Sequence, residues 1–176
     1  MKYIIAVLIF LVASINEVSA GYIEDVKNLG YVAGEGLACG AQRYKAYELV
    51  ARAYLVSSAR SDQEQEKGMN EYNQAKAQAF LSKRHDGLWN CDAINRRFNK
   101  QQIFKTKLYK DGRLKMPDGK VIIPRDEYDA TLLYDINEDE RERLNELYDN
   151  IMARKRKQAQ KEGIYDKIRK AEAKGI

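Results

Sequence analysis

Apolar and small residues recur at steps of three and four along residues 22–59, a stretch without proline. This spacing predicts one long amphipathic helix, or two helices with a kink near the glycines, because residues three and four apart share a helix face. Gly36 and Gly40 lie on the apolar stripe, whereas Gly34 lies off it. A glycine costs about 1 kcal/mol relative to alanine inside a helix. We therefore expect Gly36 and Gly40 to admit the close approach of another backbone.

A second helix is predicted to begin at Ser61, because Ser61 and Glu64 have the spacing of a capping box. Its end is indicated by basic residues up to His85 and by Gly87 beyond them, since cations and a following glycine favour a helix C-terminus. Together with the preceding helix it should form an antiparallel hairpin. A third helix is expected over residues 91–102 from the helical spacing of its apolar side chains.

The periodicity changes from helical to alternating after residue 103. Apolar and polar residues alternate over residues 104–109, and further β-prone runs occupy residues 113–116 and 121–123. Asp-Gly pairs at 111–112 and 118–119 separate the three runs, and this dipeptide favours tight hairpin turns. We expect a three-stranded meander that packs on the helices, because so small a sheet is barely stable alone.

A final helix is predicted from about Asn137 onward, after a stretch over residues 124–134 whose pattern leaves its structure open. Its charges are segregated, with seven acids and two bases over residues 135–149 and nine bases and three acids over residues 153–176. Acids first and bases last suit the helix dipole. The apolar stripe of this helix consists of Leu144, Leu147, Tyr148, Ile151 and Met152.

The first twenty residues have the order of a secretory signal peptide: Lys2, an apolar run over residues 3–13, and small residues before Gly21. The run holds about eleven residues, whereas a helix that spans hydrocarbon needs about twenty. We expect cleavage before Gly21 and a periplasmic or secreted protein. The remaining length suits one domain, or one domain with an appendage.

Cys39 and Cys91 are the two cysteines of the chain, and in an exported protein an even number favours a bridge. Closure of this span is worth about 4 kcal/mol in the loop-entropy model. The alternative is a reactive cysteine served by His85, the single histidine, but no supporting motif accompanies that pair. We therefore expect a disulfide.

These patterns together predict a mainly α fold, with a disulfide-linked helical hairpin or bundle, a small three-stranded β-meander and a charged C-terminal helix. The expected organisation is a signal peptide at 1–20, a helical domain with the meander at 21–134, and the charged C-terminal helix at 135–176.

The net charge of the chain is +5, and residues 1–20 do not contribute to it because they hold one base and one acid. Residues 21–90 carry nine bases and nine acids, so the whole excess lies between residues 91 and 176. The basic run at 154–157 has the charge to hold phosphates or an anionic surface. A solvated helix end is the plainer interpretation, and because an exported protein seldom meets nucleic acid, we expect no nucleic-acid partner.

Residues 135–146 imitate the ligand spacing of a calcium loop. Asp135, Asn137, Asp139 and Glu146 stand at ligand positions, but the sixth position is Glu140, where the sharp turn requires glycine. A capped helix start explains the pattern better. We expect no metal and no cofactor.

Glu35 lies among glycines and alanines, where a carboxylate that faced a groove would suit general acid catalysis. No second carboxylate can be placed beside it, and a solvated glutamate on the helix flank is the plainer interpretation. His85 likewise fits a role at a helix end. We assign no catalytic residue, and an envelope hydrolase that uses Glu35 stands as an alternative.

Tyrosines and bases supply the candidate partner surface, because tyrosine suits half-buried core positions and interfaces alike. We expect a non-catalytic exported protein that binds another envelope or secretion-assembly protein. Self-association, weak contact with a membrane surface, and binding of an anionic cell-surface polymer by the basic C-terminal helix are the alternatives. The candidate partner-binding residues are Tyr44, Tyr47, Tyr54, Arg154, Lys155, Arg156 and Lys157.

Overall fold

The computed structural model describes residues 21–134 and 140–172. Within them the chain is mainly helical with a small three-stranded antiparallel sheet, which confirms the expected fold class. The chain divides into two compact units, Met1–Asn137 and Glu138–Ile176, and each is described by itself. The predicted signal peptide lies outside the described residues, and so does the stretch 135–139 in which the predicted domain boundary falls.

The apolar stretch at 22–59 forms two helices, one described over residues 21–38 and α2 (Tyr44–Ser58). The first helix ends at Gly40, which adopts a left-handed φ of +65°. The amide of Gly40 donates to the carbonyl of Leu37, and the amide of Ala41 donates to the carbonyl of Gly36. This pair of bonds is the Schellman arrangement that ends a helix at glycine. The kinked alternative was therefore the correct one, and Gly40 serves as a cap.

Ser61 caps the next helix, α3 (Asp62–His85), as predicted, although Glu64 bonds to the amide before Ser61 and not to that of Ser61 itself. Ser61 Oγ accepts a hydrogen bond from the amide of Glu64 at 3.2 Å, and Glu64 Oε2 accepts one from the amide of Arg60 at 2.7 Å. The helix ends where expected, with Gly87 at a φ of +67°. Both ends of α3 were therefore readable from local chemistry.

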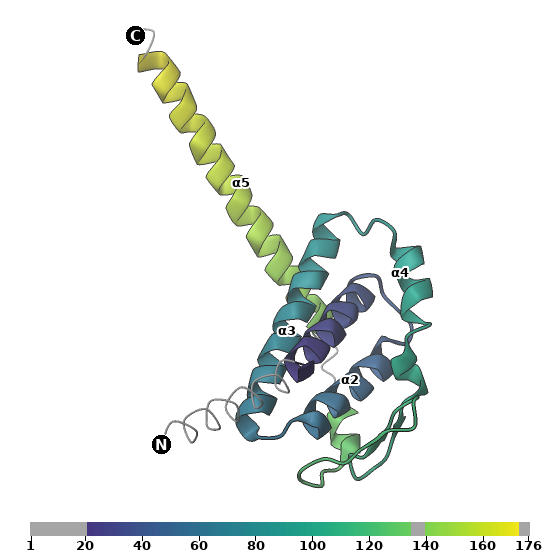
Figure 1. Ribbon diagram of the computed structural model, residues 1–176. Coiled ribbons are helices and arrows are strands. Elements are labelled where there is room, and N and C mark those ends of the chain that lie inside the picture. The colour runs from purple at the N-terminus through teal and green to yellow at the C-terminus, as the bar shows by residue number, and fades with distance from the viewer. Residues whose placement is uncertain (1–20, 135–139, 173–176) are drawn as a thin grey trace, which may run out of the picture. The chain divides into compact units, whose positions relative to one another are not determined.

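The helices α2 and α3 form the predicted antiparallel hairpin (Figure 1). Residues 59–61 connect the two helices. Glu48 lies in α2 before this connection and bonds to Tyr72 and Lys76, which lie about as many residues after it in α3, as expected for antiparallel helices. The helix at 21–38 also runs antiparallel to α2, because Tyr47 bonds to Leu29 while Tyr54 bonds to Asp25. The helix at 21–38 is consequently parallel to α3.

Close helix packing uses Gly30 and Gly34, which corrects the expectation placed on Gly36 and Gly40. A Cβ on Gly30 would collide with the carbonyl of Tyr72, and one on Gly34 would collide with the carbonyl of Lys76. Four residues apart, these two glycines share a helix face. Gly36 also lies in a close contact, but with the Phe98 ring. The apolar stripe did not predict which glycines contact another backbone, because a glycine allows close helix packing through its missing side chain and not through its hydrophobicity.

The predicted meander is present, with strands β1 (Lys107–Leu108), β2 (Leu114–Lys115) and β3 (Val121–Ile122) in that order. Leu114 pairs with Leu108 on one side and with Ile122 on the other. Gly112 and Gly119 take left-handed φ values of +84° and +88° at the two turns, as the Asp-Gly pairs predicted. Leu114 is fully buried, which anchors the sheet to the helical core.

Two boundaries before the sheet differ from expectation. The helix α4 (Cys91–Phe98) ends earlier than predicted, and a 3-10 helix, η1 (Gln102–Lys105), replaces the start of the first strand. The reason is tertiary: the Phe104 ring packs edge-on against Phe98, with centroids 5.8 Å apart, and against Tyr47 at 6.0 Å. The undecided stretch contains a second 3-10 helix, η2 (Ala130–Tyr134).

The disulfide between Cys39 and Cys91 is formed, with Cα atoms 5.2 Å apart and a sequence separation of 52. It ties the end of the first helix to the start of α4. A stable bridge of this kind indicates an oxidising compartment.

The second unit contains α5 (Glu140–Glu172), which agrees with the predicted C-terminal helix. Among residues 21–134 and 140–172, no helix combines the length and the hydropathy needed to cross a membrane.

Candidate functional site

An open groove of about 390 Å³ lies between the helix at 21–38, α2 and the segment from η1 to the β2–β3 turn. We call this feature the groove. Its volume is within the range of pockets that hold small ligands or side chains of a partner. The apolar side chains that line it include Leu29, Val32, Val50, Ile103 and Met116, and the polar ones include Asp25, Tyr54, Gln101 and Gln102.

The groove is rigid at Tyr47, a lining residue that is only 1% exposed. Its hydroxyl donates to the carbonyl of Leu29 at 3.1 Å, and its ring lies 4.9 Å from that of Phe98. Burial raises the pKa of Tyr47, and the nearby Glu48 raises it further, so the hydroxyl stays protonated and remains a donor. This tyrosine therefore ties both helices together beneath the groove.

A second tyrosine links the same two helices at the edge of the groove. Tyr54 donates its hydroxyl proton to Oδ2 of Asp25 at 2.9 Å. Burial and this hydrogen bond raise the pKa of Tyr54 to about 12. Among the described residues that line the groove, Asp25 is the only one with a formal charge at neutral pH. The groove thus offers an apolar surface beside a single carboxylate.

The three tyrosines proposed for partner binding have different positions. Tyr47 and Tyr54 line the groove, whereas Tyr44 lies in the buried core at 9% exposure and is absent from the lining. The pattern placed them on one helix face, and that face points into the protein. Tyr54 is therefore the one whose ring stays partly accessible at the groove, while Tyr44 contributes to the core.

Glu35 does not line the groove. Its carboxylate lies 2.8 Å from Nη2 of Arg97, and 13% of its side chain is exposed. This ion pair joins the first helix to α4 close to the disulfide. The geometry resembles a structural contact rather than a general acid beside a substrate cleft.

Comparisons with protein-family models, with curated proteins and with solved structures find no match. The interpretation of the site therefore rests on its residues and their geometry.

Sequence reasoning missed a buried charged cluster between α2 and α3. Glu48 accepts hydrogen bonds from Lys76 Nζ at 2.9 Å, from Tyr72 at 2.6 Å and from Arg52 Nε at 2.8 Å. Burial alone would raise the pKa of Glu48, but Lys76, Tyr72 and Arg52 together hold it below its ordinary value. An acid on the tyrosine-rich face of α2 was the available signal, because tyrosine suits half-buried core positions as well as interfaces.

This cluster is structural in its placement. Glu48 and Lys76 are 0% and 1% exposed, and neither lines the groove. Three donors bind the Glu48 carboxylate, and its complete burial closes it to a substrate from solvent. The cluster holds the hairpin together in one arrangement.

No group of three or more metal-ligating side chains gathers in the part of the chain that the structure describes. Asp135, Asn137 and Asp139 of the calcium-like spacing lie outside the described residues, and Glu146 is exposed on α5. His85 is exposed at the end of α3, without acidic or cysteine neighbours grouped around it as ligands.

The basic run at 154–157 is exposed on α5. Successive residues of a helix point about 100° apart, so Arg154, Lys155, Arg156 and Lys157 point to four sides of it. Arg154, Lys157 and Lys161, however, are three and four residues apart and share one exposed face of the helix. The run therefore supplies positive charge around the helix, and binding of an anionic polymer by this helix stays an untested alternative.

Proposed function

We propose that this protein is a non-catalytic binding module that uses the groove to hold a segment of another envelope or secretion-assembly protein. The single observation that carries the proposal is the groove itself, with its aliphatic lining, its tyrosine-braced helices and one carboxylate at its edge. Binding sites are typically apolar concavities with a few placed polar groups. Tyr47 and Tyr54 thereby keep a role in recognition, as parts of the groove.

The lining also defines the chemistry of the occupant. Leu29, Val32 and Val50 suit an aliphatic or aromatic side chain, because apolar area removed from water drives association. Asp25 suits a lysine or arginine next to it, because a charge-assisted hydrogen bond to a carboxylate adds strength and orientation. The free amide groups of Gln101 and Gln102 suit the backbone of an extended segment. We therefore propose a partner segment with an apolar residue beside a base.

The absence of a catalytic arrangement in the lining supports a binding role. The described lining residues contain no cysteine, serine, lysine or histidine. The hydroxyl of Thr106, which also lines the groove, donates to Met116 Sδ at 3.9 Å and is not paired with a base. Tyr47 and Tyr54 are both held protonated by burial. Asp25 has no second carboxylate beside it in the lining. These features favour binding over turnover.

The place of action is proposed to be the periplasm or the extracellular space. The disulfide supports an oxidising compartment, and the pattern of residues 1–20 supports export. A binding module in such a compartment would meet envelope proteins and other exported proteins.

The experiment compares two variants that add the same side chain in different places. Val32→Arg places a guanidinium in the half-buried groove, whereas Leu132→Arg adds one at a site that is 77% exposed. Cross-linking in the native envelope, followed by mass spectrometry, should recover the same partner with wild type and Leu132→Arg and lose it with Val32→Arg. The recovered partner is then purified and titrated directly against all three proteins.

A third variant tests the chemistry of the occupant. Asp25→Asn should weaken the purified partner's binding by roughly tenfold, since one charge pair is lost. Circular dichroism confirms that each variant is folded. Equal binding by wild type and Val32→Arg would contradict the proposed function, and so would a small exported metabolite as the only groove-dependent ligand.

A further inference from the structure

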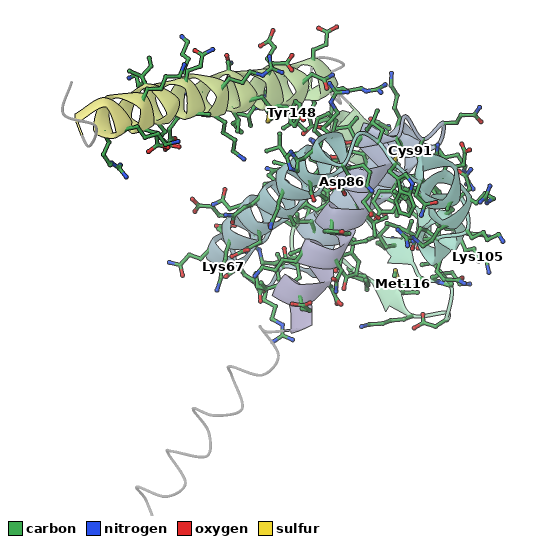
Figure 2. All side chains as sticks on the ribbon, turned by 90° about the horizontal axis from the view of Figure 1, so that it is seen from above. Lys67, Asp86, Cys91, Lys105, Met116 and Tyr148 are labelled. Atoms are coloured by element: carbon green, nitrogen blue, oxygen red, sulfur yellow. A yellow bond between two sulfur atoms is a disulfide. The ribbon has the colours of Figure 1, made fainter. Side chains whose placement is uncertain are left out.

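A short loop between α3 and α4 presents the single tryptophan of the chain to solvent. We call residues 86–90 the Trp89 loop. The Trp89 side chain is 75% exposed, although indole carries one of the largest apolar areas of any side chain. Figure 2 labels Asp86 and Cys91, which stand at the two ends of this loop. An exposed tryptophan fixed beside a disulfide calls for a functional explanation.

The backbone of the loop is held in an unusual conformation. Gly87, Leu88 and Asn90 have left-handed φ values of +67°, +60° and +66°. Glycine and asparagine tolerate this region, but a leucine there is strained because its Cβ crowds the backbone. Strain of this kind persists only where the surroundings enforce it, and it is frequent at functional sites.

Several contacts enforce the conformation. The amide of Leu88 donates to the carbonyl of Lys83 at 3.0 Å, and the amide of Gly87 donates to that of Arg84 at 3.1 Å. Lys83 Nζ donates to the carbonyl of Trp89 at 3.3 Å. The disulfide fixes Cys91 immediately afterwards. The indole is therefore presented by a rigid backbone and does not sit on a freely moving loop.

The surroundings of the loop carry excess positive charge. Its flanks hold three acids, Asp86, Asp92 and the Glu35 that pairs with Arg97. Against them stand five bases, of which Lys83 pairs with Asp86 and Arg97 with Glu35, while Arg96 and Lys100 are exposed at and beyond the end of α4. The bases are Lys83, Arg84, Arg96, Arg97 and Lys100.

One indole among polar neighbours is a poor match for a protein interface. A stable interface buries about 800 Å² on each partner, whereas a tryptophan contributes at most about 250 Å², and His85, Asn90 and Asp92 around it are polar and exposed. An aromatic ring flanked by bases is instead the combination found where proteins meet the headgroup region of membranes.

We propose that the Trp89 loop is a membrane-surface anchor, which inserts its indole among the headgroups of an anionic lipid surface while Arg96 and Lys100 contact the lipid phosphates. This interaction is separate from the groove and does not depend on its occupant. One aromatic residue with a few bases supports weak, reversible attachment. The anchor would hold the binding module at an envelope surface.

Because Trp89 is the only tryptophan, its own fluorescence reports insertion. The full disulfide-bonded protein is titrated with vesicles of phosphatidylglycerol mixed with phosphatidylcholine, and with vesicles of phosphatidylcholine alone. A blue shift and co-sedimentation are expected with the anionic vesicles, and both should weaken as salt rises because the charges are screened. Vesicles of phosphatidylcholine alone should give neither.

Variants separate insertion from general charge attraction. Trp89→Ala and Arg96→Gln/Lys100→Gln should each lower co-sedimentation by roughly tenfold, whereas Leu132→Ala, at a residue equally exposed elsewhere, should leave it unchanged. Soluble dextran sulfate provides an anion without an interface, and it should cause no blue shift.

Three results would overturn the anchor: no binding to anionic vesicles at low salt, unchanged binding by Trp89→Ala, or the same spectral shift with dextran sulfate. The first of these would exclude an anionic lipid surface as the binding site of the Trp89 indole. None of them bears on the groove, since the Val32→Arg comparison tests the groove independently.

Discussion

The ammonium group of Lys76 lies 2.9 Å from Oε1 of Glu48, and the two side chains are 1% and 0% exposed. The pair joins the two helices of the hairpin in the centre of the core. Gly34 packs directly on the carbonyl of Lys76, so the helix at 21–38 contacts the α3 backbone at the residue that forms the ion pair. A buried ion pair costs much desolvation and defines one arrangement of its helices, because misaligned packing would leave a charge unpaired.

Lys76→Met should destabilise the domain strongly. It removes the cation and leaves the Glu48 carboxylate buried, and breaking one partner of such a pair costs about 3–5 kcal/mol. Urea unfolding followed by circular dichroism measures the change.

The double variant Glu48→Gln/Lys76→Met tests the cause. Glutamine carries no charge that would be left buried without a partner, and it can still accept a hydrogen bond from the Tyr72 hydroxyl. At least half of the stability lost in Lys76→Met should therefore return. A double variant as unstable as Lys76→Met would show that packing of the lysine stem, rather than charge, accounts for the loss.

The stability of the domain should fall in acid because of Glu48. Its pKa in the folded protein lies below the ordinary value of 4.5, since Lys76, Tyr72 and Arg52 outweigh the effect of burial. A lowered folded-state pKa gives stability that is fully present above the unfolded-state pKa and is lost as the pH falls through the folded-state value. Urea midpoints from about pH 7 to about pH 3 should therefore decline below about pH 4.5. Glu48→Gln should flatten that decline, and an equally steep decline would assign it to other carboxyl groups.

Gly34→Ala should destabilise the domain by at least ~2 kcal/mol, because the added methyl group meets the Lys76 carbonyl, which the α3 backbone holds in place. Gly163→Ala is the matched control: a Cβ there meets nothing within 4 Å, and alanine favours a helix by about 1 kcal/mol. Thermal unfolding of both variants decides the matter. A Gly34→Ala protein with an unchanged melting temperature would contradict the close packing of the two helices.

Removing the disulfide should cost about 4 kcal/mol, because the bridge closes a span of 52 residues. Cys39→Ser/Cys91→Ser and wild type in reductant should have similar urea midpoints, both below that of the oxidised protein. Intact mass before and after reduction gives the control. Two thiols that alkylate without reductant in native material would argue against the bridge.

Charge neutralisation on α5 should affect association and leave folding intact. Exposed charges contribute little to stability, so the triple change of Arg154, Arg156 and Lys157 to glutamine should keep the melting temperature. It should slow association with the partner, and the difference should shrink as salt rises.

Glu35→Gln is the companion experiment and should leave partner binding and phenotype unchanged. A hydrolase that used this acid would instead lose orders of magnitude in rate. If a folded Glu35→Gln protein reproduced the deletion phenotype while the α5 variant behaved as wild type, the hydrolase alternative would replace the binding role.

Local chemistry in the sequence was enough to predict the helical class, the meander and the disulfide. The helix cap at Ser61, the helix end at Gly87 and the turns at Gly112 and Gly119 each depend on residues within a few positions of one another. Interactions of such short range depend only on neighbouring residues, so they can be predicted from hydrophobic periodicity and turn composition. Because the chain has two cysteines, only one pairing within it is possible.

Only the tertiary structure decided which surfaces meet. It assigned the close helix contact to Gly30 and Gly34, replaced the start of a predicted strand by η1 under the Phe104 ring, and paired Glu48 with Lys76. It also formed the groove from three separate segments and exposed Trp89. The physical reason is that these contacts join residues far apart in the chain, where the free energy depends on how helices are oriented against one another and not on the order of neighbouring residues.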